Sequence, residues 1–181
     1  PYTLFVGGDP AKPWTAFCRN MASTPQEYLT LVNTTNANFS QYTAGGGSPG
    51  TNVRTSYQKV RLDPATLMIN PNDQTFGSSA GMLAHGGSDP VRSMPYGAAM
   101  DCVAYGSATG VANIDLTGTP FVLAAGRFAL GGSMPAGQAV YGASGRTANL
   151  TGGGGGGRAG ALGADNPYNQ NGPALQLQYL P

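Results

Sequence analysis

The chain carries little charge. Of its 181 residues, 9 are Lys or Arg and 8 are Asp or Glu, so charged residues make up 9%, whereas soluble proteins average about 25%. Nucleic-acid binding requires several clustered cations, and the basic residues here are scattered along the sequence. No apolar run reaches the roughly 18 residues that a membrane-spanning helix needs. We therefore expect neither a nucleic-acid partner nor a membrane span.

Histidine and cysteine are equally scarce, which limits metal and nucleophile chemistry. His85 is the only histidine, and Cys18 and Cys102 are the only cysteines. A zinc site needs three or four ligands, usually with at least two from His or Cys, and neither HExxH nor GxSxG occurs. The two cysteines allow one intrachain disulfide, or they are two buried thiols. Because the Gly/Ser/Thr/Asn-rich composition is typical of exported proteins, we predict the disulfide.

Calcium is a better match than zinc, because oxygen atoms from Asp, Asn and loop carbonyls suffice for it. Our candidate metal ligands are Asn72 and Asp73 in an oxygen-rich turn, Asp101 beside Cys102, and His85, which a short loop separates from Asp89. Each has a structural alternative. Asn and Asp form Asx turns, Asp101 could be a buried hydrogen-bonded carboxylate, and His85 could be an ordinary loop histidine.

Glycine and proline are abundant, with 29 and 14 residues, and 40% of the chain is hydrophobic. Apolar and polar residues alternate with period two in short stretches, which is typical of strands. The predicted strands are 2–6, 13–18, 27–32, 57–62, 67–69, 112–116, 121–125 and 175–179. We predict one irregular, mainly β domain over residues 1–181, with mixed or antiparallel sheets, long Gly-rich loops and little helix.

Two segments read as loops. Residues 33–52 are polar and contain Gly45-Gly46-Gly47-Ser48-Pro49-Gly50, which favours an exposed loop. Residues 152–157 are six consecutive glycines, which lose much backbone entropy on ordering. We expect a flexible surface loop there, with a glycine platform packed against another backbone or a ligand as the alternative.

Tyrosines in or beside Gly-rich turns are candidate ligand contacts. Tyr42, Tyr96, Tyr105 and Tyr141 have this position. Exposed rings on loops stack on sugars or peptide side chains, whereas buried tyrosines anchor a core through the ring. With so little charge around them, these tyrosines favour recognition over catalysis.

Several segments, in this order, resemble a GON domain. They are Tyr2–Met21, Pro25–Leu31, Asn38–Ser40, Val60–Asp63, Asp73–Phe76, Met94–Cys102 and Ile114–Thr119. The resemblance covers residues 2–121, and residues 122–181 form a Gly-rich tail that ends in the strand predicted at 175–179. The first half is also loosely similar to the opening of fibrinogen-like domains, in which a YTL-type strand leads to a cysteine-bearing strand.

The resemblance implies an extracellular module like those at the end of secreted zinc metalloproteases of the thrombospondin-repeat class and in bacterial secreted proteins. Such a module is an accessory unit that engages a substrate or matrix, and the peptidase site lies in another domain. We therefore expect a secreted, non-catalytic module that binds a surface polymer, glycan or protein. Two alternatives stay open: a secreted metal-dependent hydrolase, peptidase or glycosidase, with its site near His85, and a structural extracellular protein that self-associates.

Overall fold

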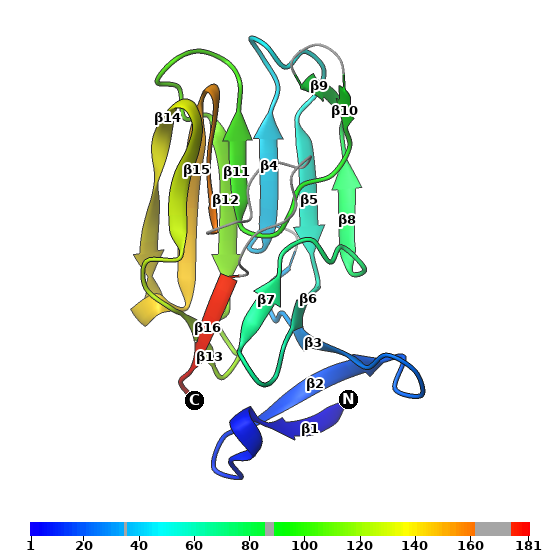
Figure 1. Ribbon diagram of the computed structural model, residues 1–181. Helices are drawn as coiled ribbons and strands as arrows, with labels where there is room; N and C mark the ends of the chain where they lie inside the picture. Colours follow the sequence, from blue (N-terminus) through cyan, green and yellow to red (C-terminus); the bar gives the residue numbers. More distant parts are fainter. Residues whose placement is uncertain (35, 86–88, 162–174) are drawn as a thin grey trace.

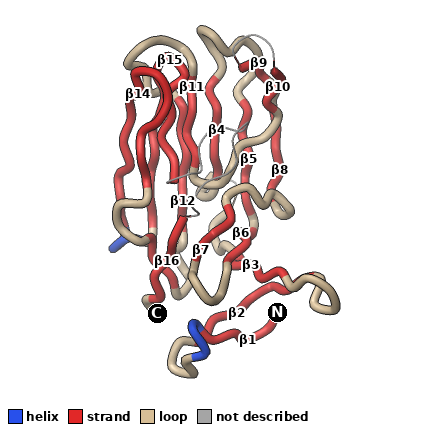
Figure 2. The backbone as a smooth tube through the Cα atoms, viewed as in Figure 1, coloured by secondary structure: helices blue, strands red, loops and turns tan. Residues whose placement is uncertain are grey.

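The computed structural model describes residues 1–34, 36–85, 89–161 and 175–181, which form mostly β-strands (Figures 1 and 2). Two short 3-10 turns, η1 (Val6–Gly8) and η2 (Ala143–Gly145), are the only helical elements in these described residues. The mainly β prediction with little helix is confirmed.

The first sheet has seven strands, and every pairing in it is antiparallel. Its order is β1 (Tyr2–Phe5), β2 (Pro13–Arg19), β3 (Gln26–Thr30), β6 (Lys59–Leu62), β7 (Met68–Asn70), β16 (Leu175–Tyr179) and β13 (Phe121–Leu123). The strand β16, which comes last in the sequence, lies between β7 and β13. The C-terminal alternation therefore forms an interior strand of this sheet.

The second sheet also has seven strands. Its members are β14 (Phe128–Gly142), β15 (Thr147–Ala161), β11 (Ala98–Asp101), β12 (Gly110–Asp115), β4 (Phe39–Thr43), β5 (Val53–Tyr57) and β8 (Gly77–Ala80). Its pairings are antiparallel except for β11 with β4, which run parallel. A separate hairpin joins β9 (Leu83–His85) to β10 (Asp89–Val91) and places residue 85 opposite residue 89.

The two sheets share one hydrophobic core. Its main cluster takes Leu62 and Ile69 from the first sheet and Ile114 and Leu150 from the second. A smaller cluster around Tyr42 lies under the β9–β10 hairpin. The alternation predicted within residues 57–62 and 112–116 is confirmed, because Val60, Leu62, Ala112, Ile114 and Leu116 are all buried. The single strand predicted over 57–62 is wrong at its start, because Tyr57 ends β5 of the second sheet and only residues 59–62 form β6.

The exposed loop predicted for residues 33–52 is wrong in its centre. Strand β4 lies there, between β5 on one edge and β12 and β11 on the other. Ser40 and Tyr42 face inward with no exposed surface. The Ser40 hydroxyl accepts a hydrogen bond from the backbone N–H of Ala98 at 3.2 Å. Because its inward side chains are hydrogen-bonded polar groups, this central strand had no hydrophobic pattern to reveal it.

The six glycines at residues 152–157 belong to strand β15, so the surface-loop prediction is also wrong. Strand β12 is antiparallel both to β4 and to residues 147–152 of β15. Strand β11, however, is parallel to β4 and antiparallel to residues 158–160. The two halves of β15 therefore run in opposite directions. The β14–β15 ribbon doubles back at the glycines, and the rings of Phe128 and Tyr141, from the two ends of β14, are 5.7 Å apart.

Close packing at the fold of the ribbon requires glycine. A side chain at residue 153 would overlap the carboxylate of Asp101. Gly154 has φ of +121°, a backbone conformation that favours glycine, and its N–H donates to Asp101 Oδ1 at 2.9 Å. A side chain at residue 154 would also overlap the backbone carbonyl of Met134, so this part of the glycine run matches the alternative prediction of a platform packed against another backbone.

A buried asparagine fixes the passage from the first sheet to the second. Asn38, with no exposed surface, precedes β4. Its Nδ2 donates to the carbonyls of Asn33 at 2.6 Å and Asp115 at 2.8 Å. Its Oδ1 accepts from the Tyr96 hydroxyl at 2.7 Å and the Asp115 N–H at 3.0 Å. All the hydrogen-bonding capacity of this amide is therefore used.

We predict that Tyr96→Phe lowers the free energy of unfolding by about 1–2 kcal/mol, because it removes a donor from a buried acceptor. Urea unfolding followed by circular dichroism measures the change. Tyr105→Phe is the matched control, since the Tyr105 side chain is 71% exposed. Loss of its hydroxyl should change the free energy of unfolding by no more than about 0.5 kcal/mol. Equal effects of the two variants would contradict the role given to the Tyr96 hydroxyl.

We predict that Gly153→Ala destabilises the protein by about 1–3 kcal/mol through overpacking against Asp101. In an Asp101→Ala background the same substitution should cost much less, because the overlapping carboxylate is gone. A double-mutant cycle by urea unfolding measures this coupling. Strict additivity of the two substitutions would show that the Asp101 carboxylate is not what restricts residue 153.

Candidate functional site

Asp101 lies at the end of β11 with no exposed surface. Its Oδ1 accepts from the Ser107 hydroxyl at 2.8 Å and the Gly154 N–H at 2.9 Å, with a longer bond from the Val103 N–H at 3.4 Å. Its Oδ2 accepts from the N–H and hydroxyl of Thr109 at 2.6 and 2.8 Å. The carboxylate thus ties the 102–109 loop to the folded β14–β15 ribbon.

These donors also decide the charge state of Asp101. Burial raises the pKa of the carboxyl, but the N–H groups of Thr109 and Gly154 and the hydroxyls of Thr109 and Ser107 favour the anion more strongly. The net pKa lies below the ordinary value. Donor hydrogens point at the lone pairs that a cation would need, so the arrangement matches the structural alternative for Asp101.

His85 is held by a buried tyrosine. Its Nδ1 lies 2.6 Å from the hydroxyl of Tyr42, which is also 2.7 Å from the hydroxyl of Ser48. Tyr42 and Ser48 have no exposed surface, and His85 is half-buried. The imidazole of His85 therefore lies at the edge of the smaller core cluster, in contact with Tyr42. The loop predicted to bring it towards Asp89 is the turn of the β9–β10 hairpin, whose residues 86–88 lie outside the described residues.

The turn after β7 contains the other two candidate ligands, Asn72 and Asp73. Oδ1 of Asp73 accepts the N–H of Thr75 at 3.0 Å, which is an Asx turn. Oδ2 of Asp73 accepts the Tyr28 hydroxyl at 3.0 Å and lies 3.8 Å from a guanidinium nitrogen of Arg61. Across the part of the chain that the structure describes, no three His, Cys, Asp or Glu side chains gather as a metal site.

The predicted disulfide is not present, because both cysteines are free thiols. Cys18, in β2, packs at the border of the main core cluster, whereas Cys102, after β11, packs at the border of the smaller one. The thiol of Cys102 lies where a side chain at residue 47 would touch it. Each cysteine therefore packs at the border of a different core cluster as a free, half-buried thiol, whereas the alternative to the disulfide had both thiols buried.

The four candidate tyrosines divide into two pairs. Tyr42 and Tyr96 are 0% and 1% exposed, so their rings serve the core and have no face available for stacking on a ligand. Burial raises the pKa of the Tyr96 hydroxyl well above its ordinary value. Tyr105 and Tyr141 are 71% and 40% exposed. They keep the ligand-contact prediction, on the 102–109 loop and on β14.

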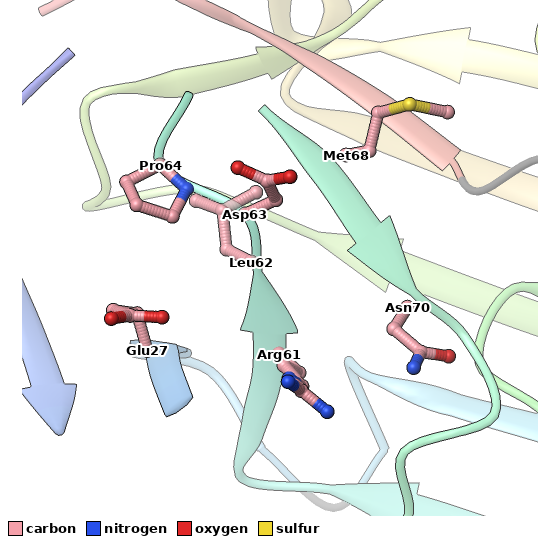
Figure 3. Close-up of a pocket in the computed structure, with 7 residues that line it drawn as sticks. All are labelled: Glu27, Arg61, Leu62, Asp63, Pro64, Met68 and Asn70. Atoms are coloured by element: carbon pink, nitrogen blue, oxygen red, sulfur yellow. The ribbon is translucent and has the colours of Figure 1, made fainter. Parts of the chain in front are cut away.

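A surface pocket that the sequence did not reveal lies on the first sheet (Figure 3). Its volume is about 440 Å³, and it is lined by Glu27, Arg61, Leu62, Asp63, Pro64, Met68 and Asn70. Arg61 lies between Glu27 on one side and Asn70 on the other, from the neighbouring strands β3, β6 and β7 (Figure 3). The outward position of Arg61 was predictable from alternation, but its neighbours come from segments far apart in sequence.

A family model described as GON domain matches residues 48–158, which is more than half of the chain. The chain belongs to the GON domain family. The matched residues overlap the resemblance as far as Phe121 and continue to Arg158. No curated protein and no solved structure matches this chain.

The part matched by the GON family contains Asp101 and all of its hydrogen-bond donors. It also contains β6 and β7 of the surface pocket, whereas Glu27, on β3, lies before it. GON is an extracellular type of domain. In the described ranges of this GON domain, no helix has the length and apolar character needed to cross a membrane.

We predict that Asp101→Asn lowers the free energy of unfolding at pH 7 by about 2 kcal/mol or more, because the charged acceptor is lost from a buried site. The pKa of Asp101 is lower in the folded than in the unfolded chain. Its contribution is therefore complete above the unfolded value of about 3.9 and disappears as the pH falls through the folded pKa.

Urea unfolding from pH 7 down to pH 2.5 tests this linkage. The difference between wild type and Asp101→Asn should shrink below about pH 4. Asp9→Asn is the comparison variant: the Ala11 N–H and Lys12 also lower the pKa of Asp9, but this carboxylate lies at the surface beside Lys12, so its effect on stability should be much smaller than that of Asp101→Asn. A difference between wild type and Asp101→Asn that stays constant with pH would contradict the assignment.

Proposed function

We propose that this GON domain is a secreted, non-catalytic binding module that engages a saccharide through the pocket on β3, β6 and β7, as an accessory unit of a larger extracellular protein. The observation that carries the proposal is the lining of that pocket. Glu27, Asp63, Arg61 and Asn70 are among the residues that line one cavity. Its volume of about 440 Å³ lies in the range of small-molecule sites.

The lining of the pocket includes residues that accept and residues that donate hydrogen bonds. Ionised carboxylates only accept, the guanidinium only donates, and an amide does both. Adjacent hydroxyl groups of a sugar donate and accept in the same way, so a saccharide can satisfy all of these groups together. The apolar surfaces of Pro64 and Met68 lie beside the polar ones and would pack on the C–H face of a sugar ring.

The charge state of Asp63 favours binding over acid catalysis. The N–H groups of Ala65 and Thr66 donate to Oδ1 of Asp63 at 2.8 and 3.3 Å. The Ala65 N–H bond contributes most to holding the pKa of this carboxyl below its ordinary value. A glycosidase acid needs a raised pKa, so that it is protonated at neutral pH. Asp63 is an anionic acceptor that the turn holds in place.

We predict that Glu27→Gln and Arg61→Gln each weaken saccharide binding about tenfold or more, because each loses a charge-assisted hydrogen bond. The probes are immobilised panels of neutral, uronic-acid-containing and sulfated oligosaccharides, followed by titration of any that bind. Arg92→Gln is the control, an exposed arginine outside the pocket. Binding that both pocket variants retain at wild-type affinity, or no saccharide binding at millimolar concentration, would overturn the proposal.

A further inference from the structure

Strand β14 lies at one border of the second sheet, and among the described residues only one of its two edges is paired with another strand. From β14 the order runs through the first half of β15 to β12, β4, β5 and β8. Strand β14 therefore forms one border of this sheet, as its outermost position in Figure 1 also shows. Among the described residues, β15 is the only strand that pairs with it. Within residues 1–34, 36–85, 89–161 and 175–181, no strand lies along its other edge, which presents backbone N–H and C=O groups.

Residues 136–142 form the regular part of this edge. They pair one to one with residues 147–153, and the register shifts of the ribbon occur before residue 136. Natural edge strands are normally protected by charged residues, proline, bulges or very short length. This stretch, Ala-Gly-Gln-Ala-Val-Tyr-Gly, has no charge and no proline, and its seven residues contain no bulge.

Several large side chains along β14 are apolar and exposed. Ala139 and Tyr141 lie opposite the buried Leu150 and Ala148, so they share the core-facing side of the sheet. Gln138 and Val140 point to the other side, and Val140 is 50% exposed. Leu130 and Met134, earlier on β14, are 45% and 64% exposed. Among the described residues, β14 thus carries 4 of the 12 large hydrophobic residues that are exposed.

We propose that a second copy of this chain pairs with β14, with the two strands antiparallel about a two-fold axis near Ala139. Such an interface is self-complementary, since each copy supplies the same edge, and main-chain hydrogen bonds would join the two second sheets into one. Charge favours a second copy as the occupant. The net charge of +1 leaves little repulsion between copies, and the uncharged edge has nothing to attract a charged peptide.

This dimer does not depend on the saccharide pocket, which lies on the first sheet.

The test is size-exclusion chromatography with light scattering, from about 1 μM to 1 mM protein. The wild type should be a dimer at high concentration. Gln138→Lys with Val140→Lys places like charges opposite or diagonal to one another across the axis, where they repel. The dimer dissociation constant should rise tenfold or more, and the same holds for the pair Gln138→Glu with Val140→Glu.

Mixing the Lys and Glu variants provides the decisive outcome, because opposite charges then face each other across the axis and a mixed dimer should re-form. Val32→Lys is the control, a 63% exposed valine outside the second sheet, and it should dimerise like the wild type. Circular dichroism and thermal melting must show each variant folded. A wild type that is monomeric at all concentrations, or a dimer that both charge variants leave unchanged, would overturn the proposal.

Discussion

The amide of Asn38 is the constraint on which the arrangement of the two sheets depends. The chain leaves the first sheet after β3 and enters the second at β4, and Asn38 lies at the end of that passage. Its side chain makes four hydrogen bonds: one with the carbonyl of Asn33, two with the carbonyl and N–H of Asp115, and one with the hydroxyl of Tyr96. In addition, its carbonyl accepts the N–H of Tyr57 at 2.9 Å. A buried amide with every group paired specifies one geometry, because any other leaves polar groups unsatisfied.

Neutral polar contacts of this kind recur through the second sheet and its loops. Tyr57 donates its hydroxyl to the carbonyl of Met94, and Thr55 accepts the N–H of the same residue at 2.7 Å. The rings of Tyr57 and Tyr96 meet edge to face with centroids 5.0 Å apart. In a chain with so few charges, these contacts give the core the specificity that hydrophobic packing alone supplies poorly.

Asp101 and the glycine run show a different use of a buried polar group. A ribbon that folds back needs residues without side chains at the fold, and it also needs a partner for the N–H groups exposed there. Gly153 meets the first need and the Asp101 carboxylate the second, since it accepts from Gly154 and from the 102–109 loop together. The ribbon that is held by this contact also contains β14, the border strand of the sheet.

The sequence by itself determined the mainly β class, the strands of the first sheet together with β12, and the GON relationship, whereas the other strands of the second sheet and the β9–β10 hairpin were not predicted. The predicted features depend on local alternation and on the order of segments, as at Val60, Leu62 and Ile114, whose burial follows from period two. Tertiary structure decided the rest. The pocket unites Glu27, Arg61 and Asn70 from three strands, Tyr42 and Tyr96 became core residues, and Cys18 and Cys102 went to different clusters. Six glycines specify no path of their own, because their backbone is the least restricted. Only the Asp101 carboxylate and the neighbouring strands, brought close by folding, give them one.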